Sequence, residues 1–262
     1  MLSIFQQWQD TGNRVKQAAL AAGREPSDVM ILAVSKTQPA ESVIEAWRAG
    51  AHGFGENYVQ EAESKIVTVR RLLADEIGHR LPGNSAIPAG IGAPQWHFIG
   101  PLQSNKTRTV AELFDWVHSV ERLKIAERLS AQRPAGLAPL QLCVQVNVSG
   151  EASKSGAAPA EAGELCLAVA RLPNVELRGL MAIPEPEADP ARQHRPFAAL
   201  RALAGDIRAR LAVELPEAAA RFDQLSMGMS GDLEAAIAEG ATIVRVGTAI
   251  FGARAAKAAP GA

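Results

Sequence analysis

The chain has 262 residues, of which 47% are hydrophobic, and 27 basic against 28 acidic side chains give a formal net charge of −1 at pH 7. This balance excludes a general basic field for nucleic acid or an anionic membrane, and no apolar run is long enough to cross a bilayer. The first residues lack the pattern of a signal peptide. Cys143 and Cys166 have no metal-ligand or CxxC spacing, which is typical of buried thiols in a reducing compartment. We therefore expect a cytoplasmic globular protein.

A helical pattern from about Ser3 to Ala22 opens the chain, and an apolar run rich in β-branched residues follows from Val29. That run ends abruptly at Ser35–Thr37, which predicts a strand buried on both faces and hence a parallel sheet. Lys36 cannot turn its ammonium into the apolar layers, so we expect it to point into the cleft beyond the strand. A neutral amine there is a nucleophile for carbonyl compounds. Alternatively, Lys36 only carries its charge to the surface from a strand end.

Strand and helix patterns then alternate along the rest of the chain. The strands are predicted at 29–35, 53–58, 96–100, 114–120, 139–149, 175–183, 224–230 and 242–251, with helices between them, including single helices over about 191–213 and 231–239. Eight such units predict one (β/α)8 TIM barrel domain over 1–262 with an extra N-terminal helix. The alternative is an open doubly wound sheet, but no GxGxxG or Walker motif marks its switch point. A Gly/Pro-rich segment, 78–95, is interpreted as a loop within the domain.

In such a barrel the carboxyl ends of all strands face one mouth. The residues expected there are Lys36, Asn57, His97, Asn147, Met181, Ser230, Gly247 and Thr248. This set lacks the paired acids of a glycosidase or a two-metal site, and no His/Cys/Asp cluster has zinc spacing. We therefore expect no metal and assign no catalytic residue.

Two of the predicted strand exits suit an anion. Ser230 follows the seventh strand beside glycines and just before a helix, and Gly247–Thr248 follow the eighth, where barrels often bind phosphate. Taken singly, a serine and a glycine before a helix are more often an N-cap. Arg245 lies within an apolar strand, so it either faces a carboxylate, points outward between helices, or donates to a ring nitrogen of a ligand. A lysine, a phosphate site and such an arginine are the parts needed to hold pyridoxal 5′-phosphate (PLP) as a Schiff base.

Six stretches carry a specific resemblance, in the same order and across nearly the whole chain. They are Ala33–Thr37, Gly53–Glu61, Trp96–Lys106, Gly179–Pro184, Leu225–Ser230 and Val244–Gly252. On these the chain resembles the pyridoxal phosphate homeostasis protein family, whose fold is similar to the N-terminal barrel of alanine racemase. The segment 78–94 is longer than the family pattern leads us to expect, which affects partner surfaces rather than cofactor binding.

The resemblance implies that Lys36 carries PLP as a Schiff base and that Arg245 faces the pyridine nitrogen. It implies that Ser230, Gly247 and Thr248 bind the phosphate, and that Asn57 is a nearer neighbour of the cofactor than His97.

Two functions remain open at this point: a PLP-dependent racemase or lyase, and a protein that buffers and delivers PLP without substantial catalysis. Racemases of the alanine racemase kind use a second base, a tyrosine from another domain. The sole tyrosine here is Tyr58, and the chain ends after the last barrel strand. Arg245 cannot give the ring nitrogen a full proton, which weakens the cofactor as an electron sink, but racemases also use arginine here, so the missing second base counts for more. We therefore favour the homeostasis role, with apo forms of PLP enzymes as recipients, and expect a monomer.

Overall fold

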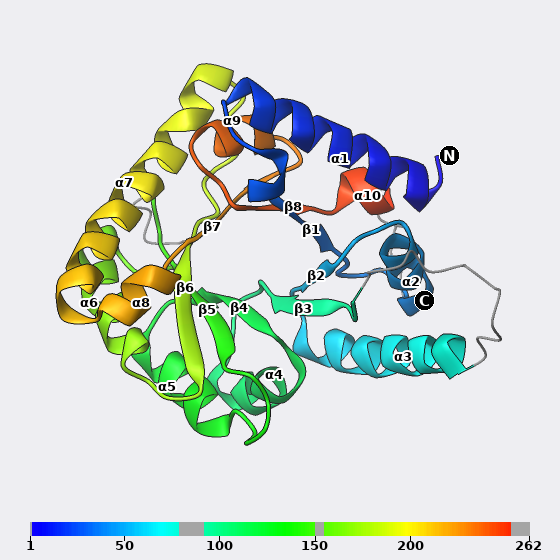
Figure 1. Ribbon diagram of the computed structural model, residues 1–262, viewed down its shortest axis with the longest axis horizontal. Helices are drawn as coiled ribbons and strands as arrows, with labels where there is room; N and C mark the ends of the chain where they lie inside the picture. Colours follow the sequence, from blue (N-terminus) through cyan, green and yellow to red (C-terminus); the bar gives the residue numbers. More distant parts are fainter. Residues whose placement is uncertain (1, 79–91, 150–154, 253–262) are drawn as a thin grey trace, which may run out of the picture.

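The structure, a computed structural model, describes residues 2–78, 92–149 and 155–252. Eight parallel strands form a closed barrel in sequence order, with β8 hydrogen-bonded back to β1 (Figure 1). This confirms the predicted (β/α)8 barrel and excludes the open doubly wound sheet. The middle of the predicted Gly/Pro-rich segment, residues 79–91, lies outside the described residues.

The strands are short and nearly all of their residues are buried or half-buried, as expected for a sheet covered by helices. Their bounds are β1 Met30–Val34, β2 Gly53–Glu56, β3 Gln95–Phe98, β4 Trp116–Val120, β5 Leu140–Gln145, β6 Val175–Met181, β7 Gln224–Met229 and β8 Ile243–Val246. All lie inside their predicted ranges except β3, which begins one residue early, at Gln95. The polar residues that follow each strand in the sequence therefore lie at the barrel mouth.

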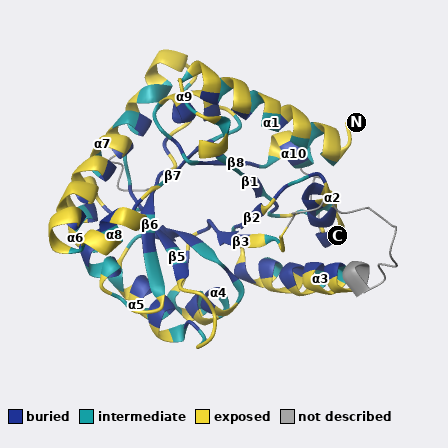
Figure 2. Cartoon of the chain, in the orientation of Figure 1, coloured by how far each residue is buried: buried dark blue, intermediate teal, exposed yellow. Residues whose placement is uncertain are grey.

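Helices surround the barrel and bury the faces that they turn toward it (Figures 1 and 2). They are α1 Ile4–Ala21, α2 Ala40–Arg48, α3 Val59–Gly78, α4 Thr107–Leu113, α5 Leu123–Gln132, α6 Pro159–Ala170, α7 Pro190–Glu214, α8 Pro216–Arg221, α9 Leu233–Ala238 and α10 Thr248–Phe251, with 3-10 turns at Pro26–Asp28 and Ser104–Lys106. The extra N-terminal helix, α1, lies beside α9 and α10. None of the described helices is long and apolar enough to span a membrane.

The structure differs from the prediction at one predicted strand and at one helix that was not predicted. The predicted last strand, 242–251, is wrong in its second half, because β8 stops at Val246 and the chain turns into α10. The Gly247 carbonyl accepts hydrogen bonds from the N–H groups of Ile250 and Phe251, both at 2.9 Å, which closes a helical turn. The second difference is α8, which begins at Pro216 just after α7 ends; proline suits the first turn of a new helix.

The apolar core lies mainly between the strands and the helices. Large aromatic side chains fill it, and the rings of Phe98 and Phe114 meet edge to face at 5.4 Å. Both cysteines are buried and free, which confirms the prediction for them. Inside the barrel, a smaller apolar group (Leu32, Ile99 and Ile243) shares the space with polar side chains. A barrel interior is usually packed with aliphatic residues, so this polar content is distinctive.

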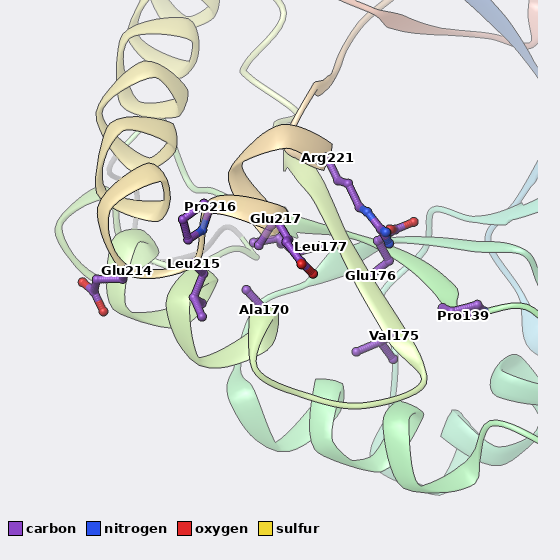
Figure 3. Close-up of a pocket in the computed structure, with 11 residues that line it drawn as sticks. Pro139, Ala170, Val175, Glu176, Leu177, Glu214, Leu215, Pro216, Glu217 and Arg221 are labelled. Carbon is purple, nitrogen blue, oxygen red and sulfur yellow. The ribbon is translucent and has the colours of Figure 1, made fainter.

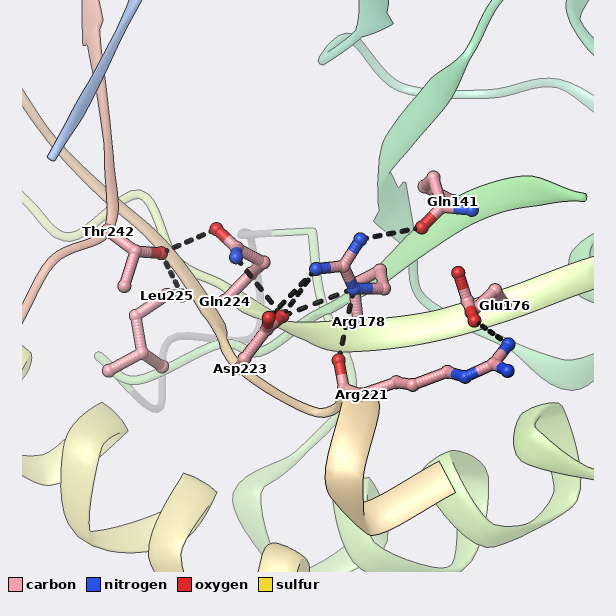
Figure 4. A network of polar contacts seen from close by, with 8 residues as sticks. All are labelled: Gln141, Glu176, Arg178, Arg221, Asp223, Gln224, Leu225 and Thr242. Carbon is pink, nitrogen blue, oxygen red and sulfur yellow. Dashed lines mark hydrogen bonds and ion pairs between the residues drawn. The ribbon is translucent and has the colours of Figure 1, made fainter. Parts of the chain in front are cut away.

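A polar network around Arg178 joins side chains of β5, β6 and the start of β7 (Figure 4). The guanidinium of Arg178 donates to both carboxylate oxygens of Asp223 at 2.8–3.1 Å and to the side-chain oxygen of Gln141 at 2.8 Å. It also lies 5.1 Å from the ring centre of Trp116. These contacts hold the neighbouring strands together near their amino ends.

Candidate functional site

A cavity of about 290 Å³ lies at the carboxyl ends of the strands. Its lining includes all six residues predicted for the site: Lys36, Asn57, Ser230, Arg245, Gly247 and Thr248. The remaining lining residues are Val34, Gln38, Ile99, Ile183, Met229, Gly231, Phe251 and Gly252. Fold topology thus brings together groups that are more than 200 positions apart in the sequence.

Lys36 lies on a four-residue turn that follows β1. The turn is closed by the N–H of Gln38, which donates to the carbonyl of Ser35 at 3.0 Å. The next residue, Thr37, has φ of 65°, in the left-handed region that a β-branched residue rarely adopts. The turn lets Lys36 leave the strand and line the cavity.

Arg245 projects from β8 into the barrel and is 4% exposed. Its guanidinium donates to the carbonyl of Ser226 at 2.6 Å, to the Ser226 hydroxyl at 2.9 Å and to the carbonyl of Ala182 at 2.8 Å. Burial lowers the pKa of Arg245 to about 10, so the side chain stays charged at neutral pH. Of the three alternatives for Arg245, the two structural ones are therefore wrong: its hydrogen-bond partners are neutral oxygens, and it faces inward.

The loop after β7 carries Ser230 and is held by the first helix. Arg14 of α1 donates to the carbonyl of Ser230 at 2.8 Å and pairs with the carboxylate of Glu234. Within β7, Gly228 has φ of 89°, and a Cβ there would lie 2.5 Å from the Cβ of Ala236. A side chain at this position would force the loop away from α9, so the glycine sets the approach of Ser230 to the cavity.

Gly247 lies where the first and last strands meet at the mouth. A Cβ at this position would lie 3.2 Å from the carbonyl oxygen of Val34, tighter than most real contacts. Thr248 follows directly as the first, exposed residue of α10. Because Gly247 has no side chain, only its backbone and the hydroxyl of Thr248 stand at this part of the cavity wall.

Asn57, on the loop after β2, carries an unsatisfied acceptor. Its side-chain oxygen is buried and has no hydrogen-bond partner among the described residues. It also borders an adjoining hollow of about 390 Å³ lined by Gln145 and Pro184, among others. The close approach of Asn57 to the next strand exit depends on Gly100, because a Cβ there would lie 2.2 Å from the Asn57 carbonyl. A buried acceptor without a donor is what a ligand hydroxyl or amine would satisfy.

Three residues expected at the mouth do not line the cavity: His97, Asn147 and Met181. The expectation for His97 is wrong, because it lies within β3 and its side chain is fully buried inside the barrel. Its ring stacks on Trp116 at 5.4 Å, and its Nδ1 lies 2.9 Å from Nε2 of His118. Burial lowers the pKa of His97 to about 3, so the ring is neutral. Met181 is likewise fully buried in β6.

Two polar groupings near the site were not predicted. In the first, Nδ1 of His118 lies 2.8 Å from the hydroxyl of Ser226, which extends the hydrogen bonds of Arg245 to the two histidines. In the second, Glu56 and Lys65 form a buried ion pair at 2.7 Å beside the Lys36 turn. The first grouping could have been predicted from the sequence, because the alternation of side chains along strands puts His118 and Ser226 on the inner face of the barrel.

Charge distinguishes this cavity from a larger one. The described lining of the mouth cavity has two cationic side chains, Lys36 and Arg245, and no acidic one. A hollow of about 570 Å³ near the amino end of β6 is lined by three glutamates and one arginine, Arg221, which is directed toward Glu176 (Figure 3). An anionic ligand is therefore favoured at the mouth and disfavoured in the larger hollow. No cluster of three metal-ligating side chains occurs in the described part of the chain.

Comparisons with known proteins agree with this architecture. The family model for the alanine racemase N-terminal domain matches residues 13–255. The chain is 58% identical over 241 residues to the pyridoxal phosphate homeostasis protein of Pseudomonas aeruginosa, covering 92% of this chain and 91% of that protein. It is 48% identical over 245 residues to the protein of the same name from Escherichia coli, covering 92% and 93% of the two chains.

A solved structure adds a ligand to the comparison. PipY of Synechococcus elongatus, in a structure with PLP bound, superposes with a TM-score of 0.70 at 33% identity. The match covers 95% of this chain and all of that one.

Proposed function

We propose, since the chain belongs to the family of pyridoxal phosphate homeostasis proteins, that it binds PLP at the barrel mouth and buffers or delivers it inside the cell. In this proposal PLP is held as a Schiff base on Lys36, with Arg245 at its ring nitrogen. Ser230, Gly247 and Thr248 bind its phosphate, and Asn57 contacts the ring substituents. The bound cofactor would supply an electrophilic aldehyde and a conjugated ring.

The residues present suit this ligand. The cavity, about 290 Å³, is at the lower end of the range for small-molecule sites, as a single phosphorylated ring requires. A primary amine, a buried cation and two hydroxyls beside a glycine complement an aldehyde, a ring nitrogen and a phosphate. The unpaired oxygen of Asn57 offers an acceptor that a ring hydroxyl could satisfy.

One observation supports holding over turnover: the described lining of the cavity contains no His, Tyr, Cys, Asp or Glu side chain. Lys36 is then the only group there suited to move protons at neutral pH, whereas racemisation requires a base on each face of the substrate. Tyr58 is 55% exposed and does not line the cavity. Arg245, with a pKa of about 10, donates a hydrogen bond to a ring nitrogen without surrendering its proton.

The first test is covalent trapping. The protein loaded with PLP should be yellow, and borohydride should fix the cofactor to one peptide containing Lys36. Lys36→Ala should abolish that adduct, while Lys124→Ala, which removes an exposed lysine of α5, should leave it unchanged. A trapped adduct that survives Lys36→Ala would disprove the assignment.

The second test separates a holder from an enzyme. The loaded protein is mixed with the apo form of a PLP enzyme, and the rate of activation is compared with the rate of spontaneous PLP release. Activation faster than release indicates delivery by contact. Racemisation or cleavage of amino acids at ordinary enzymatic rates, about 1–10³ per second, and dependent on Lys36, would refute the holding role.

A further inference from the structure

Both neighbours of Lys36 in the chain are held by charged side chains from outside its turn. The hydroxyl of Ser35 donates to Oε1 of Glu56 at 2.7 Å, and the carbonyl of Ser35 accepts from Nζ of Lys65, also at 2.7 Å. On the other side of Lys36, the N–H of Thr37 donates to Oε1 of Glu61 at 2.5 Å. The backbone on each side of Lys36 is therefore fixed relative to β2 and α3.

The turn needs such support because its conformation is unfavourable. Thr37 has φ of 65° without being glycine, and its β-branched side chain makes this region of backbone space costly. Residues in such conformations persist where the surroundings impose them, and they concentrate at functional sites. Here the contact that imposes it is the charge-assisted hydrogen bond from Thr37 to Glu61.

The three supporting side chains form one connected unit, which we call the turn clamp (Glu56, Glu61 and Lys65). Nζ of Lys65 lies 2.7 Å from Oε1 of Glu56 and 2.8 Å from Oε1 of Glu61. The Glu56 side chain is fully buried, that of Lys65 is 5% exposed, and that of Glu61 is 30% exposed. Because Glu56 and Lys65 are shielded from water, their charge pair is screened less than a pair on the surface, and removing one partner would leave a buried charge unpaired.

We propose that the turn clamp consists of positioning residues for Lys36, which aim its amine at the aldehyde carbon of the ligand. None of the three lines the cavity, so they act through the backbone of the turn. This inference rests on the proposed function, since it specifies how the covalent bond of that function is favoured. It separates two parts of binding. The clamp governs formation of the covalent bond by Lys36, whereas Arg245 and the phosphate-binding residues govern non-covalent affinity.

That separation can be measured with two ligands. PLP forms the bond with Lys36, whereas pyridoxamine 5′-phosphate carries an amine in place of the aldehyde and cannot. Glu61→Ala is the best variant because Glu61 is half-exposed and the buried pair of Glu56 with Lys65 remains. We expect Glu61→Ala to weaken PLP binding about tenfold, the value of one charged hydrogen bond, and to change pyridoxamine 5′-phosphate binding less than about twofold.

Two further variants complete the design. Glu61→Gln keeps an oxygen that can accept from the N–H of Thr37, so it should retain PLP affinity within about threefold. Glu63→Ala removes an exposed carboxylate from the same helix and should bind both ligands as the unsubstituted chain does. Thermal melting of each ligand-free variant checks that the barrel is intact, and borohydride trapping rates should fall in the same order as PLP affinity.

Three outcomes would overturn the proposal. Equal weakening of PLP and pyridoxamine 5′-phosphate by Glu61→Ala would place the effect on the cavity as a whole. Unchanged PLP affinity in Glu61→Ala would show that the turn holds itself. If the unsubstituted chain binds PLP and pyridoxamine 5′-phosphate but yields no trapped adduct on Lys36, the proposed function is refuted, and the proposal for the clamp with it. This result is distinct from the first two.

Discussion

Two buried polar networks lie under the barrel mouth, and they handle charge in opposite ways. Beneath Lys36, the turn clamp pairs a buried cation, Lys65, with the carboxylates of Glu56 and Glu61. In the second network, the buried cation is Arg245 itself, and its hydrogen-bond partners are all neutral: two carbonyls and the Ser226 hydroxyl. The first network favours a fixed backbone, because opposite charges in a low dielectric strongly favour one geometry. The second leaves the charge of Arg245 uncompensated by any carboxylate hydrogen bond, and so available to a ligand.

The pKa shifts of Glu56 and Arg245 show the same difference between the two networks. Burial raises the pKa of Glu56, and the neighbouring Lys65 opposes that rise. Burial lowers the pKa of Arg245, and the weaker opposing effects come from Asp232 and Cys143, neither of which is one of its hydrogen-bond partners. The mouth therefore combines a cluster of paired opposite charges, which fixes the Lys36 turn, with a buried positive charge on Arg245 that attracts an anion.

The substitution expected to have the largest effect on the difference between the two networks is Lys65→Met. It leaves the fully buried carboxylate of Glu56 without its cation, so unfolding free energy should fall by about 3–5 kcal/mol. Urea denaturation measures the change, and Lys16→Met, at an exposed position on α1, is the matched control. Adding Glu56→Gln to Lys65→Met should recover part of the loss. No recovery would mean that packing, rather than the stranded charge, causes it.

Arg245→Met should destabilise less, by about 1–3 kcal/mol, because it strands neutral acceptors instead of a charge. The same denaturation series checks this, with Arg208→Met, an exposed position on α7, as control. A loss equal to that of Lys65→Met would contradict the contrast, since neutral oxygens would then stabilise a buried cation as well as carboxylates do.

The histidine pair predicts a pH dependence. The folded-state pKa of His97 is about 3, below its usual 6.5, so between these values the unfolded chain binds a proton that the folded chain does not. Stability from this group is therefore present above pH 6.5 and is lost as pH falls toward 3, by about 1.4 kcal/mol per pH unit. His97→Asn should reduce the slope of unfolding free energy against pH by that amount. His52→Asn, at an exposed position, should leave the slope unaltered.

The smallest expected change is Ser226→Ala, which removes the hydroxyl shared by Arg245 and His118 while keeping the Ser226 carbonyl. Unfolding free energy should fall by about 1–2 kcal/mol, the value of the lost hydrogen bonds. Denaturation midpoints resolve this change. Stability equal to that of the unsubstituted chain would show that the link between Arg245 and the histidines contributes nothing to folding.

Much of the fold was predictable because each strand is an apolar run with a polar exit, and each following helix has its own period. The failure at 242–251 has a simple cause. Residues of α10 such as Ile250 and Phe251 are apolar, and a single helical turn is too short to show a helical period. The boundary depends on the Gly247 carbonyl accepting helical hydrogen bonds, which is a tertiary outcome.

For the site, the sequence predicted six of the residues that line the cavity but misplaced His97. A strand exit is located only to within a residue or two, and one position decides whether a side chain faces the cavity or the barrel interior. The turn clamp was missed for another reason. Lys65 lies two helical turns into α3, and nothing in a helix pattern indicates that one lysine reaches back to a preceding strand.

The seam between β1 and β8 has a consequence for biosynthesis. The two strands pair directly, with Leu32 opposite Arg245, and the cavity lies across the join, between Lys36 on one side and Gly247 and Thr248 on the other. A nascent chain still attached to the ribosome has the amine early but acquires its partners only when the last strand emerges and completes the ring. The cavity is thus complete only when β8 pairs with β1 and the barrel closes.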